Sequence, residues 1–339
     1  MKKGIWLKLK IVLGWLVLGG FLGGLVPMTP ALAQGPGMAG GALLEKPPAE
    51  EKKEEGAPTT FGPMISDTCN PIETYHAAMQ VFWALSFYGG SFNPNWRKVS
   101  SRGDFYTFQM PVKFTYGPTK NMETYVIIPF INNWVSNADR GLAGPNGERS
   151  ASYAGIGDIT FISKYNLLPE GIYRPAITAV GGFATIPTGH ASHLNRQRLG
   201  VDAIGTGALT FTTGVNLFKY LKPFLVHSQI WFNTPINIFP ASPDAVRSRE
   251  YLTFNLATEL PLTKDKKWIA LLEFYSNWTW TNISTPQGFQ SPYTLLGILP
   301  AIEFMATDKM ALALGASIDL AGKAGYQKYT PTFTVLYSF

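Results

Sequence analysis

Apolar and polar residues alternate one by one along much of the chain from Ile72 onward. Between 105 and 116, Tyr106, Phe108, Met110, Val112 and Phe114 are apolar or aromatic, while Thr107, Gln109 and Lys113 between them are polar. The segment 328–339 repeats this pattern at the C-terminus. Successive side chains of a β-strand point to opposite faces, so this period of two predicts strands with one apolar face and one polar face.

About twelve such segments occur, and their even number is typical of bacterial outer-membrane barrels. The predicted strands are 76–88, 104–116, 122–134, 156–168, 174–186, 203–217, 223–234, 250–260, 268–281, 294–305, 309–320 and 328–339.

The links between these strands alternate in length. Short links are expected at 117–121, 169–171, 219–222, 263–266 and 307–308, and long ones at 89–103, 135–155, 187–202, 235–249, 282–293 and 321–327. Short periplasmic turns and long external loops are the known asymmetry of outer-membrane barrels. A soluble two-sheet sandwich would also show alternating strands. The ordering of the loops favours an all-β fold that is a transmembrane antiparallel barrel in the outer membrane.

Composition agrees with this prediction. The chain is 46% hydrophobic and 14% aromatic but only 15% charged, against about 25% charged in an average soluble domain. Beyond the N-terminus there is no run of about 18 apolar residues, the length that a membrane-spanning helix needs. Residues 1–33 are typical of a signal peptide, with lysines, an apolar stretch and Ala31-Leu32-Ala33. We expect 34–71 to be a disordered tether, rich in Pro, Gly and charged residues, together with the lead-in to the first strand. We expect 72–339 to be the barrel.

Charge and the content of histidine and cysteine argue against binding of nucleic acid or of a metal. Four lysines of the N-terminal segment account for most of the formal net charge of +6, since the remaining chain has 24 basic and 22 acidic residues. The charge therefore gives no support for a nucleic-acid partner. The four histidines and the lone Cys69 have no spacing suited to zinc, so no metal and no cofactor is expected.

Charged and polar residues on the face expected to point inward are candidate lumen-lining residues. They are Lys113, Asp158, Lys164, His227, Gln229, Glu259, Glu273, Glu303 and Asp319. Charges at membrane depth are tolerated where they face water or one another. They therefore either line a path for solutes or form a salt-bridged plug, and the sequence leaves both alternatives open.

The C-terminus ends on an aromatic residue of the apolar face. Phe333, Val335, Tyr337 and Phe339 occupy alternate positions there. This arrangement resembles the C-terminal signal that the barrel-assembly machinery recognises, so that machinery and outer-membrane lipid are expected partners.

The segment from Gly155 to Tyr165 has the pattern G-x-G-D-hydrophobic-x-hydrophobic-x-x-K-aromatic, and a Pro-Thr-Gly turn follows the next strand at 187–189. Over about 105–339 the chain resembles the "MetA-pathway of phenol degradation" family of outer-membrane transporters, often encoded near aromatic-degradation pathways. The resemblance carries over Gly155, Gly157, Asp158 and Lys164 as motif positions without assigned chemistry.

One segment invites comparison with a catalytic site. His190 and Ser192 are two residues apart, with Asn195 nearby, and they resemble the His and Ser of twelve-stranded outer-membrane phospholipases. A serine nucleophile needs an adjacent base and a third group that orients the base. The preceding Pro-Thr-Gly turn instead predicts a loop here. We therefore expect no enzyme, and no catalytic residue is assigned.

The sequence thus predicts an outer-membrane channel for passive passage of small hydrophobic or aromatic solutes. Two alternatives stay open: an outer-membrane hydrolase that uses His190 and Ser192, and a closed structural barrel with a periplasmic tether.

Overall fold

A computed structural model describes residues 60, 62–238, 249–280, 283–285, 288–290 and 292–339. The chain divides into two compact units, Met1–Glu54 and Glu55–Phe339, and every described residue belongs to the second. The predicted signal peptide and the tether up to residue 59 lie outside the described residues.

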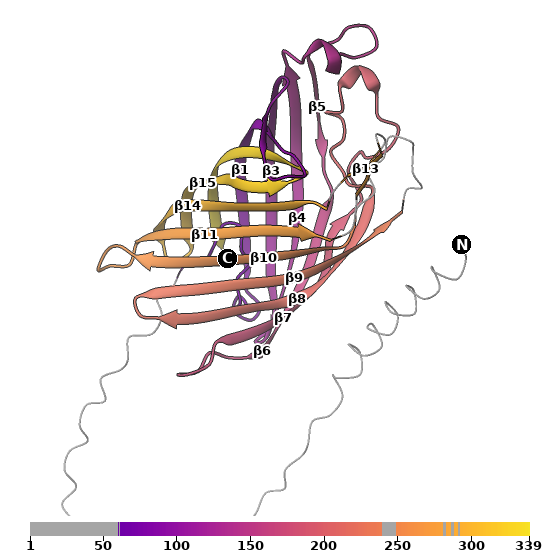
Figure 1. The fold of residues 1–339 in the computed structure, drawn as a ribbon. Coiled ribbons are helices and arrows are strands. Elements are labelled where there is room, and N and C mark those ends of the chain that lie inside the picture. Colours follow the sequence, from indigo (N-terminus) through magenta and orange to yellow (C-terminus); the bar gives the residue numbers. More distant parts are fainter. Residues whose placement is uncertain (1–59, 61, 239–248, 281–282, 286–287, 291) are drawn as a thin grey trace, which may run out of the picture. The chain divides into compact units, whose positions relative to one another are not determined.

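The described residues form one closed antiparallel barrel with twelve strand positions (Figure 1). They are β1 (Ala77–Phe92), β3 (Asp104–Thr119), β4 (Met122–Ser136), β5 (Ala151–Ile156) continued by β6 (Ile159–Leu168), β7 (Ala176–Ile186), β8 (Ala208–Leu221), β9 (Phe224–Asn237), β10 (Tyr251–Pro261), β11 (Trp268–Thr279), β14 (Thr294–Thr307), β15 (Met310–Lys323) and β16 (Gly325–Ser338). Pairing of β16 with β1, from Ala78↔Ser338 to Phe92↔Gly325, closes the barrel. A closed sheet pairs the edges that an open sheet would leave free.

All twelve predicted strands are confirmed, with two informative shifts. The strand predicted at 203–217 begins at Ala208, because Gly205 packs tightly against the loop after β7. A Cβ on Gly205 would lie 2.6 Å from the carbonyl carbon of Gly189. The strand predicted at 156–168 begins earlier, at Ala151, and is interrupted after Ile156 before β6 starts at Ile159.

The predicted alternation of short and long links is also found, with one exception. The long links carry the small elements β2 (Lys98–Ser100), η1 (Arg140–Leu142), η2 (Arg196–Arg198), β12 (Ile283–Thr285) and β13 (Gly288–Gln290). The long link predicted at 321–327 is wrong, because β15 runs to Lys323 and β16 begins at Gly325. Only Ala324, with φ +52°, separates the two strands. They pair with each other no further than Ile318↔Tyr329, and beyond that point β15 stays paired with β14 and β16 with β1.

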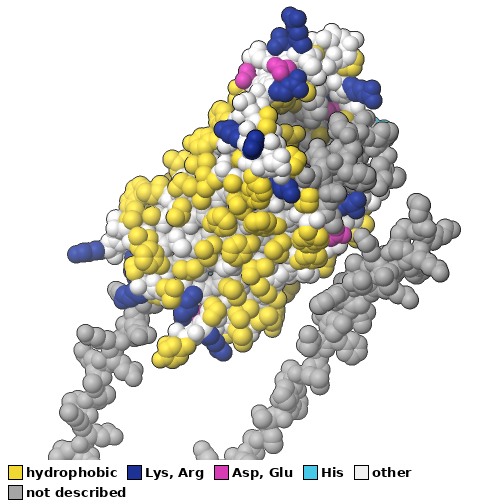
Figure 2. Space-filling view, in the orientation of Figure 1, with side chains coloured by type: hydrophobic (Ala, Val, Ile, Leu, Met, Phe, Trp, Pro, Cys, Tyr) yellow, Lys and Arg dark blue, Asp and Glu magenta, His cyan; other side chains and the backbone are white. Residues whose placement is uncertain are grey.

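The apolar face of the sheet points outward. Phe114 on β3 is 47% exposed, whereas Thr107, on the other face of the same strand, is buried. Figure 2 shows hydrophobic side chains covering the middle of one side of the barrel, with Lys and Arg toward its ends. Trp268, Trp278 and Trp280 are among the exposed aromatics. This excludes a sandwich with a dry aromatic interior, and such an exposed apolar band needs lipid around it.

Among the described residues, no helix is long and apolar enough to cross a membrane.

Candidate functional site

The candidate site is the interior of the barrel, where polar side chains are concentrated. The structure places eight of the nine predicted lumen residues on the inward face: Lys113, Lys164, His227, Gln229, Glu259, Glu273, Glu303 and Asp319. Apart from Lys113, all of them are buried. Because the outer face is apolar, these groups find partners on the inner side of the wall: one another, water in the lumen, or chain that lies inside the barrel.

The N-terminal segment 64–72 lies inside the barrel and contains no strand. Glu273 on β11 binds its start. The Glu273 carboxylate accepts hydrogen bonds from the backbone N–H groups of Met64 at 2.6 Å and Ser66 at 2.7 Å. Ile65 donates to the same carboxylate at 3.1 Å. One buried carboxylate thus satisfies three consecutive backbone donors, which fixes this segment against the wall.

Asp67 continues this attachment to side chains of the wall. Its carboxylate lies 3.3 Å from Lys164 Nζ and 3.7 Å from Lys113 Nζ. The amide of Asn216 donates to its second oxygen at 3.0 Å. Lys164 Nζ is also 2.7 Å from Glu123 Oε1. Two wall lysines therefore face two carboxylates, and one of these carboxylates belongs to the segment.

The end of the segment is held by further polar contacts. Lys164 Nζ donates to the carbonyl of Thr68 at 3.0 Å. The hydroxyl of Thr178 donates to the carbonyl of Cys69 at 2.6 Å, and the N–H of Ile72 donates to Glu123 at 2.8 Å. The segment thus crosses the lumen on side chains of β4, β6, β7 and β11. These contacts resemble the salt-bridged plug, one of the two alternatives that the sequence allowed. The carboxylate that pairs with both lysines, however, belongs to Asp67, which lies outside the barrel strands.

Two further polar pairs belong to the wall itself. His227 Nε2 on β9 lies 3.0 Å from Glu259 Oε1 on β10, and both side chains are buried. The hydroxyl of Tyr275 donates to Asp319 at 2.8 Å. These contacts join neighbouring or nearby strands across the inner face.

Asp158 is the predicted lumen residue that lies elsewhere, at the break between β5 and β6. Its carboxylate accepts hydrogen bonds from the N–H groups of Gly189 at 3.0 Å and Thr206 at 2.7 Å. The hydroxyl of Thr188 donates to the carbonyl of Gly157 at 2.8 Å. The two sequence motifs, at 155–158 and 187–189, therefore meet at one place. Together they hold both ends of the loop 187–207.

This loop covers a cavity of about 720 Å³ at the long-loop end of the barrel. Leu199 and Val201 of the loop line it, together with Tyr88 on β1 and Phe105 on β3. A chain of hydrogen bonds fixes its wall: Tyr88 and Thr107 hydroxyls lie 3.2 Å apart, Thr107 donates to Asn133, and Asn133 donates to the carbonyl of Val201. We call this cavity the outer chamber. Aromatic and apolar side chains line it together with the polar side chains of Ser91, Ser100, Ser101, Arg102, Thr107 and Asn133. Sites for small organic ligands combine apolar walls with polar groups that orient the ligand.

His190, Ser192 and Asn195 all lie in the loop after β7 rather than on a strand. His190 Nδ1 is 3.0 Å from the carbonyl oxygen of Asp202, and its ring packs near Tyr153. The Asn195 side chain accepts from the N–H of Gln197 and so caps η2. Each of these two groups therefore has a structural partner within the loop, and the hydrolase interpretation gains no supporting contact from the described residues.

Several residues of the site were not predicted. Glu123, Thr178 and Asn216 occupy inward positions of their strands, so the alternation could have identified them. Asp67 lies outside any strand and follows no periodic pattern. Only its pairing with Lys113 and Lys164 shows its importance.

No family model and no curated protein sequence matches this chain. Among solved structures it is similar to an outer-membrane channel from Pseudomonas putida F1, with a TM-score of 0.63 and 14% identity over 80% of this chain and 98% of that one. The translocator domain of the autotransporter NalP from Neisseria meningitidis gives a TM-score of 0.43 at 9% identity, covering 79% of this chain and 90% of that one. The toluene transporter TbuX of Ralstonia pickettii gives 0.40 at 9% identity, covering 80% and 92%. The first of these likenesses shows the fold, that of an outer-membrane barrel.

Proposed function

We propose that this protein is an outer-membrane channel for passive passage of small hydrophobic or aromatic solutes, of the kind that the MetA-pathway resemblance implies. The observation that carries the proposal is the outer chamber. It is large, it opens among the long loops, and aromatic side chains line it. An apolar solute of one or two rings gains free energy there at about 25 cal/mol for each Å² removed from water.

The segment 64–72 stands below this chamber as an inner barrier. It is attached by side-chain contacts to Glu273, Lys164 and Glu123, not by strand pairing. Side-chain contacts of this kind break without disturbing the closed sheet, so the segment can leave while the barrel stays intact. The channel would open its full length by that displacement.

Electrical recording with matched uptake tests this proposal. The full chain is purified and inserted in planar bilayers, and cells producing it take up radiolabelled toluene. Glu273→Ala removes the acceptor of three backbone hydrogen bonds, so we expect larger or more frequent conductance steps than in the wild type. Toluene uptake should exceed that of cells without the protein. If neither the wild type nor Glu273→Ala conducts in bilayers, and toluene uptake equals that of cells without the protein, the proposal is overturned and a closed structural barrel is favoured.

A further inference from the structure

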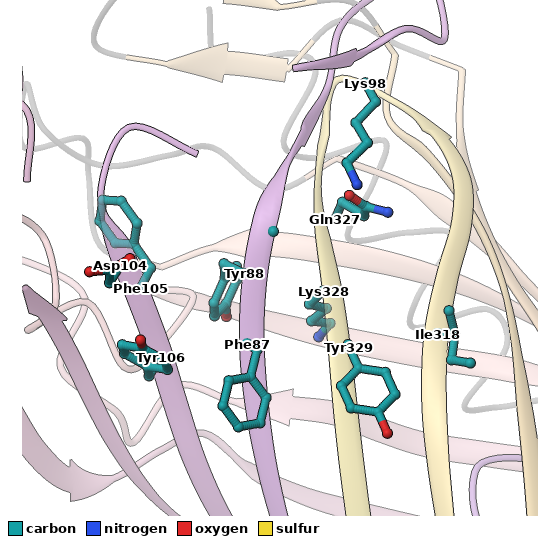
Figure 3. Close-up of a pocket in the computed structure, with 11 residues that line it drawn as sticks. Phe87, Tyr88, Lys98, Asp104, Phe105, Tyr106, Ile318, Gln327, Lys328 and Tyr329 are labelled. Carbon is teal, nitrogen blue, oxygen red and sulfur yellow. The ribbon is translucent and has the colours of Figure 1, made fainter. Parts of the chain in front are cut away.

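The outer face of the barrel has a cavity beside β1, near the long-loop end (Figure 3). Phe87 on β1 and Tyr329 on β16 are paired residues, 39% and 47% exposed, and both line this cavity. On the inner face of the same strands, Ser86 and Thr330 are buried, and their hydroxyls lie 2.8 Å apart. The wall between β1 and β16 is therefore closed at this height. We call this space of about 320 Å³ the outer-face cavity.

The outer-face cavity exists because of an irregularity in β1. The register of β1 with β16 shifts between Tyr88 and Gly90, which leaves Gly89 as an extra residue. Such a bulge bends a strand and re-aims its neighbours. Gly89 has no side chain, and a Cβ at this position would meet only the side-chain oxygen of Gln327, at 3.5 Å. The space that an outward side chain would fill is therefore left open.

Gln327 presents to this space a hydrogen-bond acceptor that lacks a donor. Its Nε2 donates to the carbonyl oxygen of Asp319 at 3.5 Å, which orients the side-chain amide. Its Oε1 is buried and accepts no hydrogen bond from any described residue. Native structures rarely leave a buried acceptor unsatisfied. An N–H or hydroxyl group from outside the chain fits this place.

Lys98 brings a positive charge to the same cavity. It lies on β2, and Figure 3 shows its ammonium end directed toward Gln327. Among the described residues, no carboxylate pairs with Lys98. Asp104, which also lines the cavity, lies on the other side of β1 in Figure 3 and accepts a hydrogen bond from Asn137 at 2.8 Å. A basic side chain at the membrane surface attracts anionic lipid head groups.

These groups follow one another in a fixed order. Lys98 lies nearest the long loops, Gln327 follows, and the rings of Phe87 and Tyr329 lie toward the middle of the strands (Figure 3). A cation, an acceptor that needs a donor and an apolar surface therefore succeed one another. The long loops of an outer-membrane barrel face the outside of the cell, so the adjoining lipid belongs to the external leaflet.

We propose that the outer-face cavity binds lipid A, the phosphorylated glucosamine glycolipid of the external leaflet. Its phosphate pairs with Lys98, because lysine binds phosphate as a point charge. An amide N–H, at the place where acyl chains join the sugar, donates to Gln327 Oε1. An acyl chain lies on Phe87 and Tyr329, and the space suffices, because a cavity of about 150 Å³ already holds benzene. The inference goes beyond the proposed channel function and does not depend on it.

A glycerophospholipid satisfies the same groups less well. It offers a phosphate and acyl chains, but its chains join the head group through esters, which accept hydrogen bonds and donate none. Gln327 Oε1 would then keep no donor at the junction of head group and chains, and an unsatisfied buried acceptor is costly. Phosphatidylglycerol is therefore the comparison lipid for a test.

Native mass spectrometry of the purified protein in detergent measures the binding of each lipid. We expect lipid A to bind more tightly than phosphatidylglycerol of matched chain length. Removal of the lipid A phosphates should weaken binding about fivefold, the effect of one basic residue on an anionic lipid. Equal affinity for lipid A and phosphatidylglycerol would overturn the assignment to lipid A. Equal affinity for lipid A with and without phosphates would overturn the role of Lys98.

Three variants locate the binding site. Lys98→Gln removes the charge and should weaken lipid A binding about fivefold, with no further loss when the phosphates are removed. Gly89→Leu fills the space in front of Gln327 and should weaken binding at least as much. Arg140→Gln is the matched control, because Arg140 is an exposed cation of η1 that does not line the cavity. Its affinity should equal that of the wild type. Equal weakening by Lys98→Gln and Arg140→Gln, or wild-type affinity in Gly89→Leu, would overturn the site.

A second measurement does not depend on the folding of Gly89→Leu. The wild type, Lys98→Gln and Arg140→Gln are extracted from outer membranes in mild detergent, and the lipid A that stays with each protein is quantified. The exposed position of Lys98 makes its replacement harmless to folding. The wild type and Arg140→Gln should retain lipid A in the same ratio to protein, and Lys98→Gln should retain less. Retention that is absent in the wild type, or undiminished in Lys98→Gln, would overturn the proposal.

Discussion

Lys164 Nζ lies 3.3 Å from Asp67 Oδ1, so an ion pair inside the barrel joins a wall strand to the segment that fills the lumen. Lys164 is also the partner of Glu123. Lys164→Met therefore leaves two buried carboxylates without their shared cation. Breaking such a buried pair costs about 3–5 kcal/mol. We expect this loss of free energy to destabilise mainly the position of the segment 64–72, because no strand pairing holds the segment in place. We expect higher conductance in bilayers than for the wild type.

Lys219→Met is the matched control for this substitution. Lys219 pairs with Glu170 at 3.1 Å, but both side chains are partly exposed, and the hydrogen bonds of Lys219 go to the carbonyls of Gly171 and Ile172 rather than to the segment. Its conductance should equal that of the wild type. Equal conductance of Lys164→Met and Lys219→Met would mean that the ion pair does not hold the segment in place.

The sequence predicts the wall well because the wall obeys one local rule. The strand predicted at 104–116 is found at Asp104–Thr119, and Lys113 faces inward as its position in the alternation requires. The segment 64–72 follows no such rule. Its position depends on single contacts between residues far apart in the chain, such as Ile65 with Glu273. Periodicity carries no information about contacts of that kind.

Asp158 shows the same limit at the barrel rim, and it yields a second prediction. Its carboxylate accepts from the N–H groups of Gly189 and Thr206 and so ties down both ends of the loop 187–207. Hydrogen bonds to a charged acceptor contribute about 1.5–3 kcal/mol each. Asp158→Ala should free the loop, and trypsin should then cut after Arg196 or Arg198 faster than in the wild type, as followed by mass spectrometry of the fragments.

Asp139→Ala provides the comparison for this experiment. Asp139 also lies in a loop of the rim and pairs with Arg102 at 2.9 Å, but both side chains are about half exposed. Exposed pairs contribute at most about 1 kcal/mol, so cleavage after Arg196 or Arg198 should keep its wild-type rate. If both variants are cut at the same rate, Asp158 does not hold the loop.

A third prediction concerns close packing inside the barrel. Gly297 on β14 faces the ring of Tyr275, and a Cβ at this position would overlap the ring and its hydroxyl. Gly297→Ala must therefore displace Tyr275 from Asp319. Overpacking typically costs about 1–3 kcal/mol, so the barrel should lose its folded mobility in semi-native electrophoresis at a lower temperature. Gly181→Ala, which meets no atom, should unfold at the wild-type temperature. Identical unfolding temperatures for the two variants would contradict the overlap.

The last prediction separates assembly from stability at the C-terminus. The N–H of Phe339 donates to the carbonyl of Ala77 at 2.8 Å, so the backbone of the final residue helps to close the barrel, while its side chain is 58% exposed on the outer face. Phe339→Ala keeps that hydrogen bond and removes only an exposed ring. If the barrel-assembly machinery recognises the ring, less folded protein should reach the outer membrane, yet the purified variant should unfold at the wild-type temperature. Phe114→Ala, which removes an exposed ring from β3, should leave the amount in the membrane unchanged. Equal yields of the two variants would show that the terminal ring is not recognised.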